Sequence, residues 1–384
     1  MLYEEYKDIV EASKQEMYRV LGEMRKLGTL SKAHDESHCE AVANYGGIAT
    51  EALMSMFPNY AENVSNLTRI AGYLHDIKRE STEKIPHGPA GAEYFSNLCK
   101  TRSPWTKIDN VAYDAIYRAI QEHEGSFKDI VTKFGSPTQP NLLYNIDSRV
   151  PSVVAHGVLV GDKALEASGY RVLERRSYFV GKERMLKDLK DIFKYPDESH
   201  LAVLGETQIR LYARNPIVEY PSWLRDFAEE WHAIQYAFYR GLLNYANMTE
   251  EEAAKFMLEK KFPKFTPELA EQIHKQRHLD PSYFASQGFI GLANRIEEQK
   301  NYDQGDLAIS CGKLVSLFAQ AESPEKAIED FWKSKETQPR YLLNFMSGIK
   351  EYREGTGKTA ENLRKHIITE LERVYKANEL KRDT

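Results

Sequence analysis

The feature that most constrains this chain is a histidine–aspartate pair, His75-Asp76, near the end of an apolar stretch. The residues that recur at helical spacing around the pair are apolar: Ile70, Ala71, Leu74 and Ile77. This spacing predicts a helix whose last turn lies against a core. A carboxylate buried there is costly unless a cation or several hydrogen-bond donors meet it. A metal ion beside the helix, or a pair of ions, would meet both side chains; a purely structural hydrogen bond within the pair is the alternative.

Length and composition set the broad class of protein. The chain has 384 residues, of which 42% are hydrophobic and 28% charged, enough for a large core in two domains or in one elaborated domain. The formal net charge of −5 offers no general basic field for nucleic acid. Three widely spaced cysteines argue against a disulfide framework, and no stretch suits a signal peptide or a membrane span. We therefore expect a cytoplasmic globular protein without membrane partners.

Periodic apolar residues predict helices along most of the chain, and therefore an all-α fold. In the first half, the expected helices span residues 3–27, about 35–57, 66–78, 88–99, 108–123 and 141–147. In the second half they span residues 223–247, 283–299, 307–320, 324–333 and 341–352, with further helices capped at Thr249 and Thr266. One short extended piece is expected at residues 208–212.

We expect residues 1–165 to form a metal-binding helical domain. Residues 166–384 would form a further helical region that shapes a pocket, acts as a lid or mediates oligomerisation. The last helix carries one apolar stripe, formed by Leu363, Ile367, Leu371 and Val374. Such a stripe suits either docking on the body of the protein or a two-helix seam in a homo-oligomer.

Four further residues stand at the ends of helices or in apolar runs, where they could reach the same metal as the first pair. His38 precedes an apolar helical run, His87 opens the next helix, and His123 closes a helix on its buried side. Asp147 is an acid within an apolar run. Taken singly, each is more typical of a core or capping residue. Together they supply enough ligands for two divalent ions, for which imidazole favours Fe, Zn, Ni or Mn.

Residues 30–160 resemble the HD-domain superfamily of metal-dependent phosphohydrolases. The resemblance rests on ordered motifs: His38 at a helix start, Leu74-His75-Asp76-Ile77, His87 in a His-x-x-x-Gly-Ala element, His123 at a helix end, and Asp147. It implies an HD-type helical bundle with one ion held by His38, His75, Asp76 and Asp147, and a second ion held by Asp76, His87 and His123. This set resembles the two-metal branch, although a single ion is the alternative. Glu122 and Gly125 around His123 differ from the signature of cyclic-dinucleotide phosphodiesterases and disfavour that branch.

The resemblance implies hydrolysis of a phosphoester of a nucleotide or small phosphorylated metabolite, with a metal-bridging hydroxide as the nucleophile. Asp76 would be the central catalytic residue. Lys78, Arg79 and Lys84 follow it closely and could neutralise the substrate phosphate, and Arg149 is a further candidate for substrate binding. For the first three, the alternative is a solvated position at a helix C-terminus, which the helix dipole favours.

Two other functions fit the same residues. Relatives with this ligand set resemble diiron oxygenases, which cleave C–C or C–P bonds with dioxygen. A non-catalytic, metal-stabilised module that binds a nucleotide or a protein is the second alternative. Three further histidines were weighed as ligands. His34 lies four residues before His38, but only His38 is followed by apolar periodicity and is preferred. His274 and His278 lie four apart on a helix and could bind a metal, but both are expected to be exposed.

Overall fold

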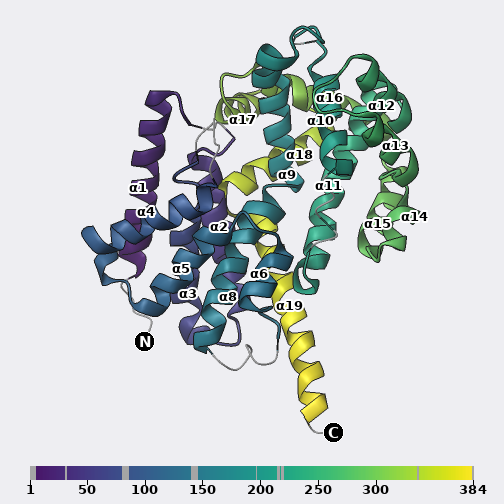
Figure 1. Cartoon of the computed structure of the whole chain (residues 1–384). Coiled ribbons are helices and arrows are strands. Elements are labelled where there is room, and N and C mark those ends of the chain that lie inside the picture. The colour runs from purple at the N-terminus through teal and green to yellow at the C-terminus, as the bar shows by residue number, and fades with distance from the viewer. Residues whose placement is uncertain are drawn as a thin grey trace. The chain divides into compact units, whose positions relative to one another are not determined.

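The computed structural model describes residues 6–30, 33–79, 86–139, 146–195, 197–213, 217, 220–334 and 337–382. Within these ranges the protein consists of helices and their connections, without a β-strand (Figure 1). This confirms the predicted all-α fold. None of the described helices is both long and apolar enough to cross a membrane.

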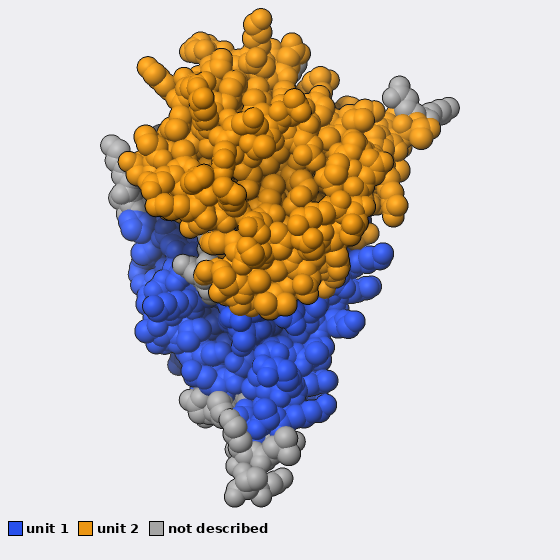
Figure 2. Space-filling view, turned by 90° about the vertical axis from the view of Figure 1, so that its right-hand side faces the viewer, with its two compact units in different colours: residues 1–166, 219–227, 353–384 blue, residues 167–218, 228–352 orange. Residues whose placement is uncertain are grey.

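The chain divides into two compact units (Figure 2). Unit 1 comprises residues 1–166, 219–227 and 353–384, and unit 2 comprises residues 167–218 and 228–352. Unit 1 therefore combines the expected metal-binding domain with two later stretches of the chain. The second stretch contains α19 (Gly357–Arg382), which packs on α2 (Glu36–Leu53) and buries Leu363, Ile367 and Leu371. The apolar stripe of the last helix thus docks within unit 1.

Unit 1 is organised around α3 (Pro58–Leu74), which packs against four other helices of the unit. Its elements up to residue 166 are α1 (Tyr6–Leu27), α2, α3, α4 (His87–Thr101), η1 (Trp105–Lys107), α5 (Asn110–Glu122), α6 (Phe127–Phe134), α8 (Ile146–Leu159) and the π-helical η2 (Val160–Leu165). The apolar residues that flank the histidine–aspartate pair are all buried: Ile70, Ala71, Leu74 and Ile77. The end of α3 therefore lies in the core, as the spacing predicts.

Two glycines allow α3 and η2 to approach α2 closely. A Cβ on Gly72 of α3 would lie 2.7 Å from backbone atoms of Ala43, and one on Gly161 of η2 would lie 2.7 Å from backbone atoms of Val42. Side chains at either glycine would force the helices apart. Val42 lies one helical turn after His38, so these contacts set the distance from His38 to the end of α3 and to η2.

Unit 2 is also helical, and it shares two helices with unit 1 because α11 and α18 cross the unit boundaries. Its elements are α9 (Gly169–Arg175), η3 (Arg176–Leu189), α10 (Ser199–Ala213), most of α11 (Ser222–Ala246), α12 (Glu250–Glu259), α13 (Pro267–Gln276), α14 (Pro281–Ser286), α15 (Ile290–Glu298), η5 (Gln299–Asn301), α16 (Gln304–Gln320), α17 (Pro324–Lys333) and most of α18 (Arg340–Glu354). The caps predicted at Thr249 and Thr266 are confirmed, since each side chain accepts a backbone N–H of the first turn.

Some predicted elements were wrong. Residues 208–212 belong to α10 and are not extended. The second helix ends at Leu53 instead of near residue 57, and Pro58 begins α3, because proline suits the first position of a helix. Residues 283–299 form two helices, separated near Gly288, whose φ of +82° interrupts the helical path. Of the helix predicted at residues 141–147, residues 141–145 lie outside the described ranges.

Unit 1 also buries a histidine away from the histidine–aspartate pair. His156 on α8 is fully buried, its Nδ1 donates to the Ser152 carbonyl oxygen at 2.8 Å, and its ring packs edge-on against Trp223. Burial lowers the pKa of His156 to about 4 from the ordinary 6.5. The unfolded chain therefore takes up a proton at a higher pH than the folded protein does, so the folded state loses stability as pH falls below about 6.5.

We expect alanine at Gly72 to lower the free energy of unfolding by about 1–3 kcal/mol, the usual cost of overpacking a core. The matched control is Gly22→Ala on α1, where a Cβ would meet nothing within 4 Å. That change should stabilise the protein by roughly 0.5–1 kcal/mol through helix propensity. Urea unfolding followed by circular dichroism measures both variants, and equal stabilities would refute a close helix contact at Gly72.

We expect the shifted pKa of His156 to remove about 2 kcal/mol of stability between pH 7.5 and pH 5. The His156→Phe variant should lack this part of the pH dependence, because phenylalanine does not titrate. Unfolding experiments at the two pH values on the wild type, this variant and the exposed-site control His274→Phe measure the difference. Identical pH dependence in all three proteins would show that His156 is not buried in its neutral form.

Candidate metal centre

The ends of several helices in unit 1 bring histidines and carboxylates together. His38 lies in the first turn of α2, where Asp35 caps the helix by accepting the backbone N–H of His38 at 3.2 Å. His75 is the C-terminal cap of α3, and Asp76 follows it. The other members are His87, the first residue of α4; His123, the C-terminal cap of α5; and Asp162 in η2. All of these side chains are buried except that of Asp162, which is 14% exposed.

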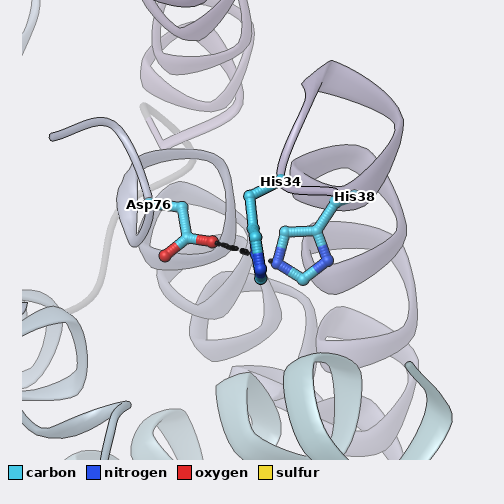
Figure 3. A group of neighbouring side chains, drawn as sticks. All are labelled: His34, His38 and Asp76. Atoms are coloured by element: carbon cyan, nitrogen blue, oxygen red, sulfur yellow. Dashed lines mark ion pairs between the residues drawn. The ribbon is translucent and has the colours of Figure 1, made fainter. Parts of the chain in front are cut away.

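The carboxylate of Asp76 lies at the middle of the group, and its two oxygens face different histidines. Around Oδ2 lie His34 Nδ1 at 2.9 Å, His38 Nε2 at 3.2 Å and His75 Nε2 at 3.5 Å. Around Oδ1 lie His87 Nε2 at 2.9 Å and His123 Nε2 at 3.4 Å. Figure 3 shows the rings of His34 and His38 beside this carboxylate.

The distances between the ring nitrogens match those between ligands of one ion. His38 Nε2 and His75 Nε2 are 3.1 Å apart, and His87 Nε2 and His123 Nε2 are 3.0 Å apart. Ligands about 2.1 Å from a metal ion and about 90–110° apart lie about 3.0–3.4 Å from each other. Three groups could hold a metal ion: His34, His38 and Asp76; His38, His75 and Asp162; and His75, Asp76 and His123.

Oxygen atoms on the outer side of the rings fix which nitrogen faces inward. The Nδ1 atoms of His75 and His123 each donate to a backbone carbonyl, of Gly72 and Ile120 respectively, at 2.7 Å. The Nδ1 atoms of the other two rings face carboxylates, with His38 at 3.4 Å from Glu166 and His87 at 3.1 Å from Glu124. A proton on Nδ1 leaves the lone pair on Nε2. Such outer partners orient histidines that bind metals.

In the neutral state of the rings, the facing lone pairs would need a cation between them. Two buried, unprotonated nitrogens about 3 Å apart repel each other unless a proton or a metal ion lies between them. The Asp76 carboxylate also needs a cation or hydrogen-bond donors, because its negative charge is buried among histidine rings. A divalent ion would satisfy the nitrogens and the carboxylate together.

The pKa values of the group follow from burial and from charge. Burial lowers the pKa of His75 to about 4, which keeps this ring neutral and able to bind a metal at neutral pH. Burial alone would also lower the pKa of His38, but Glu166 and Asp76 raise it to about 9. Burial would raise the pKa of Asp76, but the surrounding histidines, His75 first, hold it well below its ordinary value. A metal ion bound by His38 would therefore displace a proton.

Asp147, which the resemblance assigned to the first ion, is exposed in the first turn of α8 and lies outside this group. Asp162 stands in the group instead, with Oδ1 at 3.5 Å from His38 Nε2 and 4.0 Å from His75 Nε2. The two acids are fifteen residues apart along one helical run, a separation of about 20 Å. Because the Asp147 side chain is exposed, water can solvate its carboxylate, and no cation is needed to balance its charge.

Arg149, which the sequence suggested for substrate binding, lies away from the surface. It is completely buried, and its two terminal nitrogens donate to the backbone carbonyls of Pro137 and Leu53. Burial lowers the pKa of this guanidinium to about 10. A side chain in this position ties the end of α2 to the segment before α8, and it is closed to a substrate.

The cations that follow Asp76 differ in position. Arg79 is half-buried, and its guanidinium lies 3.3 Å from His87 Nε2 and 3.6 Å from Asp76 Oδ1. Lys78 is exposed, with its ammonium 4.5 Å from the centre of the Tyr94 ring. Lys84 lies outside the described residues. Only Arg79 of the two described cations therefore adjoins the candidate centre.

The structure adds four residues that sequence reasoning did not assign. His34 was set aside, yet its Nδ1 approaches Asp76 more closely than either His38 or His75 does. Asp162 had a signal, since it shares helical spacing with the buried Val158 and Leu165. Glu124 and Glu166 face ring nitrogens from outside the centre.

Comparison of the chain with family models, with curated proteins and with solved structures finds no match. What the centre can do is therefore argued from its own chemistry. Neutral imidazole nitrogens and carboxylate oxygens are the ligands of Fe, Mn, Zn and Ni in proteins. The group can hold such an ion in a buried position, close to a half-buried arginine.

We expect Asp162→Ala to lower the affinity for a divalent ion at least tenfold, because it removes a carboxylate from the centre. The matched control is Asp147→Ala, which removes an exposed acid and should leave the affinity unchanged. Titration of the metal-free proteins with Mn²⁺ or Zn²⁺, followed by mass-spectrometric metal analysis, measures both. The reverse pattern, with affinity lost only in the Asp147 variant, would return the ligand set to the one that the sequence resemblance implies.

Proposed function

We propose that unit 1 is a metal-dependent phosphohydrolase of HD-domain type that acts on a nucleotide or a small phosphorylated metabolite. One observation carries the proposal: the Asp76 carboxylate turns one oxygen to His38 and His75 and the other to His87 and His123. A carboxylate between two sets of histidines suits a pair of divalent ions. We assign Asp162 to the first ion, in place of Asp147.

Two bound divalent ions would activate water near neutral pH and stabilise the charge of a phosphoryl group. The protein's own contribution begins with Asp76, which holds both halves of the centre in register. The outer carbonyls of Gly72 and Ile120 keep the rings of His75 and His123 in one orientation. Preorganised ligands of this kind avoid the cost of rearrangement during the reaction.

Arg79 is the residue best situated to bind the substrate phosphate. Its guanidinium adjoins the half of the centre that contains His87, and guanidinium groups bind phosphate through paired hydrogen bonds.

Lys163, next to Asp162 in η2, has a structural role. Its ammonium donates to the Glu124 carbonyl at 2.7 Å and to that of Gly125, so it ties η2 to the turn after α5. This tie positions the neighbouring Asp162.

The same ligands suit a diiron oxygenase, and the fifth histidine, His34, adds to the imidazole character that iron accepts. The two functions differ in what they consume. A hydrolase releases phosphate with Mn²⁺ in the absence of oxygen. An oxygenase consumes oxygen with iron and releases no phosphate from a simple phosphate ester.

We expect the Mn²⁺-loaded protein to hydrolyse members of a panel of nucleotides and sugar phosphates, and a chelator to abolish this activity. Asp76→Asn should lower kcat at least a hundredfold together with bound metal, while Asp147→Asn should change neither. Phosphate release and oxygen uptake are measured side by side. Oxygen uptake without phosphate release would establish the oxygenase, and metal binding without either would leave a binding module.

We expect Arg79→Ala to raise KM for the phosphorylated substrate about tenfold or more, since it removes a charged contact to phosphate. Metal content should remain that of the wild type. Lys78→Ala is the matched control, because it removes a neighbouring but exposed cation and should leave KM unchanged. Steady-state kinetics with metal analysis decides the matter; an unchanged KM in the Arg79 variant would exclude this residue from substrate binding.

A further inference from the structure

Unit 2 buries an arginine whose terminal nitrogens have no hydrogen-bond partner among the described residues. Arg176 begins η3 and is 4% exposed. Both of its terminal nitrogens are buried and make no hydrogen bond to any other residue that the structure describes. A guanidinium carries a permanent positive charge, and burying one without an anion costs several kcal/mol. Arginine is seldom found in such a position unless something else meets it.

Glu206 is the acid whose negative charge acts on Arg176, but its carboxylate already pairs with two other arginines. Glu206 on α10 pairs with Arg184 through one carboxylate oxygen and with Arg210, at 3.4 Å, through the other. Arg176 feels the opposing charges of Arg210 and Glu206. Glu206 is therefore shared between ion pairs with Arg184 and Arg210, and it makes no hydrogen bond to the terminal nitrogens of Arg176.

Two polar side chains of α11, those of His232 and Tyr236, interact electrostatically with the guanidinium and add no positive charge. Burial and the charge of Arg176 lower the pKa of His232 to about 3, so this ring is neutral. His232, Gln235 and Tyr236 follow one another at the spacing of one helix face, and all three are buried. Tyr236 is held by His278, with its hydroxyl 3.1 Å from Nδ1. His278 is thus buried, where the sequence had predicted an exposed side chain.

Two more buried polar atoms lie beside these residues in the chain and have no partner among the described residues. They are the hydroxyl of Ser177, which follows Arg176, and the side-chain oxygen of Gln235. Buried polar atoms of folded proteins nearly always have a partner, in the protein, in water or in a ligand. A polar ligand with an anionic group would satisfy all three side chains. Its anionic group would meet the cation of Arg176, and its other polar atoms would bind the Ser177 hydroxyl and the Gln235 oxygen.

We propose that Arg176 is the centre of an anion-binding site in unit 2, which takes the carboxylate or phosphate group of a small ligand. Guanidinium binds either group through two parallel hydrogen bonds. Gln235 would accept a hydrogen bond from the same ligand. The residues of this site belong to unit 2 and are not those of the metal centre, and the inference does not depend on the proposed phosphohydrolase activity.

The test measures binding of inorganic phosphate and of citrate to the full chain by equilibrium dialysis and by thermal unfolding. The Asp76→Asn background is used throughout and is kept free of metal, so that phosphate held at the metal centre is not counted. We expect one equivalent of one of these anions to bind and to raise the Tm as its concentration rises. The preferred anion identifies the class of ligand. Failure of both anions to bind at millimolar concentration would overturn the proposal.

The variant Arg176→Met replaces the cation with an apolar side chain of similar length. We expect it to weaken binding of the anion at least tenfold. Without the anion it should have a higher Tm than its parent, because an unpaired buried charge has been removed. Arg340→Met, at an exposed position of unit 2, is the control and should change neither quantity. If Arg176→Met does not fold, dialysis of the parent still decides the question; undiminished binding in a folded Arg176→Met protein would refute the assignment.

Discussion

The buried carboxylate of Asp76 is the interaction on which the rest of unit 1 depends. A single aspartate with five ring nitrogens within 3.5 Å cannot be placed by one helix. It requires the ends of α2, α3, α4 and α5 to meet at one point. The glycines at positions 72 and 161 permit the approach of α3 and η2 to α2, because a side chain at either would displace a backbone.

Helix ends suit this purpose because their backbone groups are free to bind side chains. The last carbonyls of a helix have no partner within it. His75 uses the Gly72 carbonyl and His123 uses the Ile120 carbonyl, in each case the residue three positions earlier. The same local arrangement at the ends of α3 and α5 thus orients two rings toward one centre. The carbonyl that each ring uses lies in the last turn of its helix.

The sequence predicted the part of the centre that follows from short-range periodicity. The apolar spacing around His75 and Asp76 placed them in the core, and the apolar run that follows His38 placed it at a helix start. Asp162 lies within η2, a π-helical segment in which each residue turns by less than in an α-helix. Its spacing from the buried Val158 and Leu165 indicates a core-facing position, but the 3.6-residue period of α8 does not continue unchanged into η2. Asp147 and Asp162 are both acids among apolar residues in the sequence. In the structure, Asp147 is exposed, whereas the Asp162 side chain is only 14% exposed.

His34 illustrates a second limit. It precedes the N-terminal cap Asp35, so no helical period connects it with the core. Its approach to Asp76 depends on the path of the chain before α2, which packing determines. Periodicity within a helix predicts a buried face; it says nothing of a side chain that reaches the same point from a turn.

Arg149, Arg79 and Arg176 differ in the groups that contact their guanidinium, and these contacts distinguish their roles. Arg149 is buried, but its terminal nitrogens meet the carbonyl oxygens of Pro137 and Leu53, so its place is structural. Arg79 is half-buried beside Asp76 and His87, and under the proposed function a metal ion would engage those two residues and make the guanidinium available to a substrate phosphate. Arg176 is buried without either kind of partner among the described residues. Burying a guanidinium whose terminal nitrogens make no hydrogen bond is costly, and the anion proposed for unit 2 would offset that cost.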